Sequence, residues 1–151
     1  MDDESVADQP EYRRPCDWDD ATVVPSYAYQ LYHFWANLTC LNKLRASRGL
    51  NVFSLRPHCG ESGSVSHLVT GYMLADSIAH GVNLTRNSPL QYLFYLDQVG
   101  VHVSPSSNNF LFLKLKDSPF HSFFKRGLSV SLSTDDPMIF HLSSEPLMEV
   151  G

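Results

Sequence analysis

Three short segments of the sequence gather side chains that can bind a metal ion or move protons. They are 55–61 (LRPHCGE), 76–81 (DSIAHG) and 131–137 (SLSTDDP). In the first two, His58, Glu61 and His80 stand at or just past a short apolar run. In the third, Asp135 and Asp136 follow such a run. Two adjacent carboxylates at the end of a buried strand are costly unless a positive group meets them, so we expect a metal ion or a polar ligand there.

Alternating helix and strand patterns must position these segments. We expect helices near 25–48, 65–75, 89–98 and 119–127, strands near 51–56, 77–79, 101–103 and 128–132, and one more helix beginning at 145–150. Strands that alternate with helices form parallel sheets with right-handed crossovers. Polar clusters at the ends of several such strands are typical of a site on the carboxyl face of an α/β barrel.

The helix limits rest on local signals. Apolar residues with helical spacing fill the first helix and Gly49 ends it, while Pro89 and Pro119 stand in the first turns of later helices. The polar stretch 104–109 (SPSSNN) follows the third strand. It is either a loop that contacts a ligand or a simple turn, and turns favour the same residues.

Length limits how much of a barrel the chain can form. It has 151 residues, and a complete (β/α)8 barrel needs about 250. We therefore expect a partial barrel over 25–151, incomplete at both ends, after an irregular lead-in over 1–24. Four strands would leave two unpaired edges, which favours a fragment of a longer polypeptide.

Composition excludes several other classes of protein. The net charge of −5 gives no basic surface for nucleic acid. No apolar run approaches the roughly 20 residues that span a bilayer, and the acidic start resembles no signal peptide. Three unpatterned cysteines favour a reducing compartment, and we expect a cytosolic protein without membrane or nucleic-acid partners.

These motifs resemble the adenosine/AMP deaminase family, and its AMP branch more closely. RPHCGE over 56–61, the His-Gly pair at 80–81, SPSSNN over 104–109 and STDDP over 133–137 occur in the order that the family has. The similarity covers nearly all of 22–150. It implies that the chain supplies the last four strand–helix units of a TIM barrel. It also implies hydrolytic deamination of AMP to IMP and ammonia in purine nucleotide metabolism, and a homo-oligomeric parent.

The resemblance also implies roles for individual residues. His58 and Asp135 would be zinc ligands, Glu61 would give a proton to the purine ring, and His80 would be the base for the attacking water. Asp136 would hold the N7 edge of the purine, and the three residues after it would line the pocket: Pro137, Met138 and Ile139. Without the motifs, each histidine would fit a core or loop position, and each acidic residue a helix N-terminus or turn.

One expected part of the zinc site does not occur in the sequence. The family adds two histidines in an H-x-H pair, and no two histidines here are two residues apart. Since a catalytic zinc site has three protein ligands, we expect the isolated chain to bind zinc weakly and not to turn over AMP.

Three interpretations remain open from the sequence. The chain is a piece of an AMP deaminase, or an inactive short product that associates with full-length subunits, or part of an adenosine deaminase. The residues of the RPHCGE and SLSTDDP motifs match the AMP branch, which favours an AMP deaminase over an adenosine deaminase.

Overall fold

The computed structural model describes residues 25–111, 113–141, 143–145 and 148. Its centre is one sheet in the order β1-β2-β3-β4, with every neighbouring pair parallel. The strands are β1 (His58–Cys59), β2 (Ser77–His80), β3 (Gly100–Val103) and β4 (Val130–Leu132). The expected α/β class, with four parallel strands that alternate with helices, is confirmed. The predicted lead-in over 1–24 and most of the helix predicted at 145–150 lie outside the described residues.

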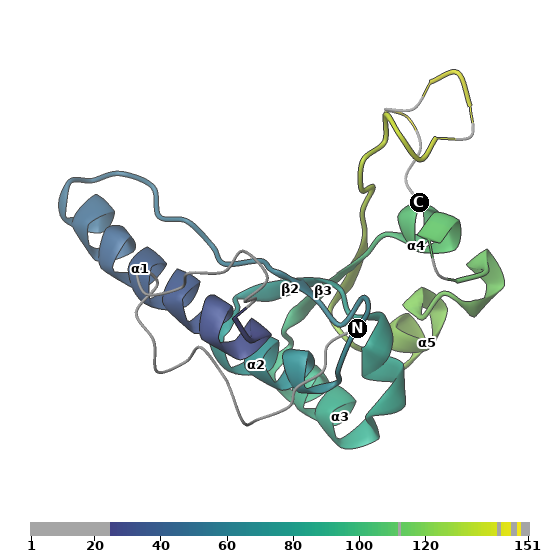
Figure 1. The fold of residues 1–151 in the computed structure, drawn as a ribbon, viewed down its shortest axis with the longest axis horizontal. Coiled ribbons are helices and arrows are strands. Elements are labelled where there is room, and N and C mark those ends of the chain that lie inside the picture. Colours follow the sequence, from purple (N-terminus) through teal and green to yellow (C-terminus); the bar gives the residue numbers. More distant parts are fainter. Residues whose placement is uncertain (1–24, 112, 142, 146–147, 149–151) are drawn as a thin grey trace.

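One helix precedes the first strand and the others connect the strands (Figure 1). They are α1 (Tyr27–Ser47), α2 (Ser66–Leu74), α3 (Ser88–Asp97), α4 (Pro105–Leu111) and α5 (Phe120–Lys125), with short 3-10 turns η4 (Val82–Arg86) and η5 (Leu115–Asp117). In Figure 1, α1 projects away from the sheet, whereas α2 and α3 lie beneath it. No helix among the residues that the structure describes is long and apolar enough to cross a membrane.

Side chains at the helix starts explain where two of these helices begin. The Ser26 hydroxyl accepts a hydrogen bond from the Tyr29 amide, and the Asn87 side chain accepts one from the Leu90 amide. Each satisfies a backbone donor that the first turn of a helix leaves free. Pro89 lies in the first turn of α3, as predicted, where its missing N–H costs nothing.

The hydrophobic core lies between the sheet and the helices that cover it. Ile78, Val101 and Val103 on the strands are fully buried, and so are Phe94 of α3 and Phe123 of α5. Ile78 on β2 and the two valines on β3 alternate with less buried neighbours, so one face of the sheet packs on helices. This packing fixes the strand ends that carry the polar motifs.

The strand predicted near 51–56 is wrong. The segment is irregular, and the strand is instead β1, so His58 lies within a strand rather than past one. Side chains take the backbone bonds that a strand would use: the Phe53 amide donates to Oδ1 of Asn42 and the Leu55 amide to Oδ2 of Asp76. Apolar residues in this segment also stay exposed, Phe53 by 50%.

Two further expectations are corrected at the last two strands. The strand predicted over 128–132 begins at Val130, and it is not buried, since Ser131 and Leu132 are exposed. Its outer edge has no neighbouring strand within the described residues. The stretch after β3 is neither a loop nor a simple turn: it forms the helix α4, which begins at Pro105.

Candidate active site

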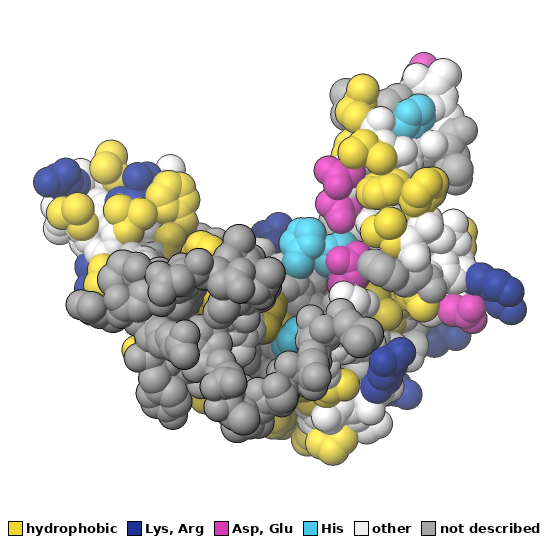
Figure 2. All heavy atoms as spheres, in the orientation of Figure 1, with side chains coloured by type: hydrophobic (Ala, Val, Ile, Leu, Met, Phe, Trp, Pro, Cys, Tyr) yellow, Lys and Arg dark blue, Asp and Glu magenta, His cyan; other side chains and the backbone are white. Residues whose placement is uncertain are grey.

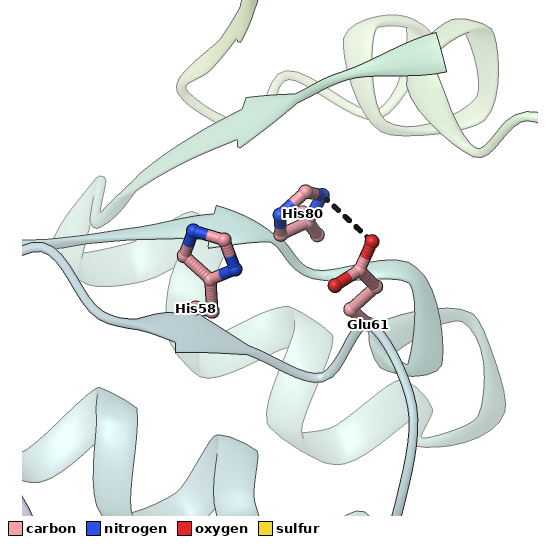
Figure 3. Close-up of side chains that lie close together, drawn as sticks. All are labelled: His58, Glu61 and His80. Atoms are coloured by element: carbon pink, nitrogen blue, oxygen red, sulfur yellow. Dashed lines mark ion pairs between the residues drawn. The ribbon is translucent and has the colours of Figure 1, made fainter. Parts of the chain in front are cut away.

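Three side chains from two neighbouring strands converge at the carboxyl end of the sheet (Figure 3). His58 lies on β1, Glu61 follows β1, and His80 is the last residue of β2. Each offers a ligand atom, and these atoms lie within 4.8 Å of one another. The rings of His58 and His80 meet edge to face with centroids 4.7 Å apart. The structure therefore brings together three of the residues that the motifs singled out.

Glycines let the backbone turn at both strand ends. Gly60 and Gly81 have φ of +68° and +63°, in the left-handed region that favours glycine. A Cβ on Gly60 would come within 2.5 Å of Leu68, and one on Gly81 within 2.7 Å of Val101. His80 itself has a φ of +70°, which is uncommon for a residue with a side chain. These turns direct Glu61 and His80 toward one another.

His80 is the centre of the cluster. Its ring is 1% exposed, with Nδ1 3.4 Å from Oε1 of Glu61 and Nε2 3.7 Å from Oδ2 of Asp135. Burial has the largest effect on the pKa of His80 and lowers it. The Glu61 and Asp135 carboxylates raise this pKa and His58 lowers it, so that the net shift is downward. A histidine of this kind is neutral near pH 7 and can accept a proton.

Asp135 joins the cluster from the segment after β4. It is 29% exposed, and the hydroxyl of Ser107 donates to its Oδ2 at 3.4 Å. In Figure 2, histidine and acidic side chains lie side by side at the base of the arm that the C-terminal segment forms. The third motif thus reaches the site that the first two form.

The other residues expected at the site lie on the surface of the described chain. Asp136 is exposed, and so are Met138 and Ile139, by 68% and 66%. Pro137 is half-buried. Backbone amides of Ile139 and Phe140 donate to the Asp136 carbonyl, which closes a turn just past Asp135. Among the described residues, no hydrogen bond or ion pair joins these four side chains to His80 or Glu61.

Sequence reasoning missed the residues that support the site from behind. Tyr27 of α1 donates through its hydroxyl to the His58 carbonyl at 2.8 Å. Asn83, which is 4% exposed, donates from its backbone amide to the Gly60 carbonyl at 2.7 Å and from its side chain to the Gly63 carbonyl. No motif marks either residue, because each contact spans about 20 residues or more of the chain.

Asn108 is the residue whose importance the sequence left undecided. It is 1% exposed on α4, and its Nδ2 lies 3.1 Å from Oε1 of Glu61 and 3.2 Å from Nδ1 of His80. The stretch 104–109 pointed to ligand contact or to a turn. The structure shows instead that this stretch contacts the acidic and imidazole groups of the cluster.

The donor set of the cluster fits a transition metal. Imidazole nitrogens and carboxylate oxygens are the ligands that zinc takes in proteins, and His58, Glu61 and His80 form a possible His/Glu metal site. The sequence predicted His58 and Asp135 as the ligands. The structure places Asp135 against His80, on the opposite side of that ring from Glu61.

Comparisons with known proteins identify the family of this chain. The family model for AMP deaminase matches residues 1–150. AMP deaminase 1 of Mus musculus is 55% identical over 125 residues, which is 83% of this chain and 17% of the mouse protein. AMP deaminase of Saccharomyces cerevisiae is 51% identical over 152 residues, which is 99% of this chain and 19% of the yeast protein.

A solved structure with a similar fold is the crystal structure of adenine deaminase from Arthrobacter aurescens. It superposes with a TM-score of 0.61 at 26% identity, over 82% of this chain and 36% of that one. The four units described here are therefore part of a barrel of this type. The chain spans about a fifth of the length of the AMP deaminases it matches. On the family model and these identities, the chain belongs to the AMP deaminase family.

Proposed function

We propose that the polypeptide that contains this chain converts AMP to IMP and ammonia by hydrolysis. One observation carries the proposal: His58, Glu61 and His80 converge at the carboxyl ends of parallel strands, with Asp135 3.7 Å from His80. Ligands bind at this face in α/β barrels. Membership of the AMP deaminase family supports deamination as the reaction of this cluster.

His58 and Asp135 would hold a zinc ion, as the resemblance implies. The two donors come from segments that are far apart in the sequence, and further histidine ligands would come from a preceding part of a longer polypeptide. Zinc, when bound, supplies Lewis acidity that makes water a nucleophile near neutral pH.

Glu61 and His80 would divide the proton transfers between them. Glu61 would donate a proton to the ring nitrogen next to the attacked carbon, which raises the electrophilicity of that carbon. His80 would take the proton of the attacking water, and its burial, which keeps it neutral, supports that role. The two groups lie 3.4 Å apart, so both can reach one small reacting centre.

The C-terminal segment would recognise the purine. Asp136 would meet the N7 edge, where a carboxyl group and a ring nitrogen must share a proton, since each otherwise only accepts. Pro137, Met138 and Ile139 would line the pocket. Met138 and Ile139 are exposed in the described chain, which leaves them available for contact with a ligand.

Further proposals concern the whole protein. We propose a cytosolic homo-oligomer, and free Cys40 and Cys59 support a reducing compartment. The alternative remains a short, inactive product that associates with full-length subunits. AMP rather than adenosine is supported by identities of 51% and 55% to AMP deaminases.

The test is to express the complete polypeptide that carries this chain and to follow ammonia release from AMP and from adenosine. The proposal requires rapid release from AMP with IMP as the product, and slow release from adenosine. Preference for adenosine, or no ammonia from either compound, would contradict it.

A further inference from the structure

Asn108 connects the two groups that would move protons. Its carboxamide nitrogen lies 3.1 Å from Oε1 of Glu61 and 3.2 Å from Nδ1 of His80. The three residues come from α4, from the segment after β1 and from the end of β2. One buried amide therefore joins three separate elements at the site.

The backbone holds Asn108 in place independently of these contacts. Its amide donates to the Ser104 carbonyl at 3.0 Å, and its carbonyl accepts from the Leu113 amide at 2.8 Å. The side chain is 1% exposed, and its Oδ1 is buried without a partner among the described residues. Leaving a buried acceptor unpaired is unfavourable, so the residue is poorly explained by packing alone.

We propose that Asn108 is a positioning residue that fixes the orientation of Glu61 and His80 and the tautomer of His80. The inference rests on the proposed deamination, to which it adds a residue. An amide nitrogen carries only donors. Nδ1 of neutral His80 must then accept, and the ring proton stays on Nε2, which faces Oδ2 of Asp135 at 3.7 Å.

The same geometry ties Glu61 to His80. One atom of the Asn108 carboxamide faces both Glu61 and His80. The two groups must therefore either both accept a hydrogen bond from that atom or both donate one to it. With the nitrogen facing them, both accept. With the amide turned over, its oxygen faces them and both donate, which leaves Nε2 of His80 bare and a proton on Glu61. The structure has the first arrangement. Deamination would need the second, in which Glu61 carries a proton and Nε2 of His80 is free to accept one, so the amide would turn over before the reaction.

A spectroscopic experiment on the 151-residue chain tests the tautomer directly. The imidazole nitrogens are labelled with ¹⁵N, and the His80 signals are assigned by their loss in His80→Gln. We expect separate signals for a bare and a protonated nitrogen in the unsubstituted chain. Asn108→Ala should bring them toward an average, because both tautomers then become accessible.

Asn108→Asp gives a sharper result with a side chain of the same size. A carboxylate only accepts, so Nδ1 of His80 must carry a proton, and its signal should change from the bare to the protonated type. Asn37→Asp, at an exposed position of α1, should leave the His80 signals unchanged. Unchanged His80 signals in both Asn108 variants would overturn the proposal.

Kinetics separate positioning from a merely structural role. In Saccharomyces cerevisiae AMP deaminase, the segment that matches this chain is replaced by residues 1–151. We expect Asn108→Ala to lower kcat for AMP by about 10–100-fold, as for other residues that orient reactive groups, with KM little changed. Asn37→Ala should change neither constant, and an unchanged kcat in Asn108→Ala would contradict positioning.

The two proposals fail separately. A chimera with unsubstituted residues 1–151 that releases no ammonia from AMP would count against the proposed function, while the His80 signals would still decide the role of Asn108. If the chimera is active and Asn108→Ala has the same kcat and KM as Asn37→Ala, the proposed deamination stands and the positioning role of Asn108 is contradicted.

Discussion

Nδ1 of His80 lies 3.4 Å from Oε1 of Glu61, and the two side chains meet although they belong to different strand–helix units. The parallel pairing of β1 with β2 sets this distance, since His80 is in register with Cys59, the residue after His58. Chemistry at this site therefore depends on the sheet register and on the glycine turns that follow each strand.

Gly81→Ala should lower the free energy of unfolding more than Gly49→Ala. Both glycines have a positive φ, +63° and +68°, which costs an alanine about 1–2 kcal/mol. Only at Gly81 would the new Cβ also come within 2.7 Å of Val101, whereas nothing lies within 4 Å at Gly49. Overpacking adds roughly 1–3 kcal/mol.

Urea denaturation of both variants measures this difference. Gly49→Ala is the matched control, because it keeps the backbone penalty and removes the steric one. Equal losses in the two variants would show that Val101 does not restrict the turn after β2.

His102→Gln should reduce the dependence of stability on pH. Burial has the largest effect on the pKa of His102 and Arg56 adds to it, and both lower this pKa below 6.5. Below pH 6.5 the unfolded chain therefore takes up this proton more readily than the folded chain. The free energy of unfolding includes this contribution in full above pH 6.5 and loses it as the pH falls toward the lowered pKa.

The measurement compares unfolding free energies at about pH 7.5 and about pH 5.5. The loss on acidification should be smaller in His102→Gln than in the unsubstituted chain. His121→Gln, at an exposed position of α5, should keep the full loss. An equal loss of unfolding free energy in all three chains would show that folding does not lower the pKa of His102.

His58→Ala and Asp135→Asn should each weaken zinc binding by the complete polypeptide. Loss of a direct ligand should cost at least the roughly 10–100-fold that is typical of residues behind the ligands. Competition with a chelator of known affinity measures the change, with His121→Ala as the control. Zinc affinity that survives in Asp135→Asn but falls in His80→Ala would instead favour the set His58, Glu61 and His80 as ligands.

The sequence predicted those parts of the fold and site that local signals encode. Pro89 and the apolar spacing of 25–48 gave two helices close to their observed limits, and the α/β class followed from alternation. The strand at 51–56 failed because apolar content does not show that Asn42 and Asp76 would bind the backbone there. Asn108 stayed undecided, since its contacts with Glu61 and His80 exist only after three distant segments meet.

The site residues also differ in how far the sequence predicts them. Glu61 and His80 stand in sequence motifs, and the family resemblance of those motifs implies a role for each residue. Tyr27 stands in no motif, and only the packing of α1 against α2 brings its hydroxyl to the His58 carbonyl.

The most direct test of the central claim is the deamination rate of the complete polypeptide with Glu61→Gln. Glutamine keeps the size of the side chain and removes the acidic proton. We predict that kcat for AMP falls about 10²–10⁴-fold, the usual contribution of a proton donor, while Glu145→Gln keeps its rate. Ammonia release from AMP at an unchanged rate in Glu61→Gln would contradict the assignment of this cluster as the active site.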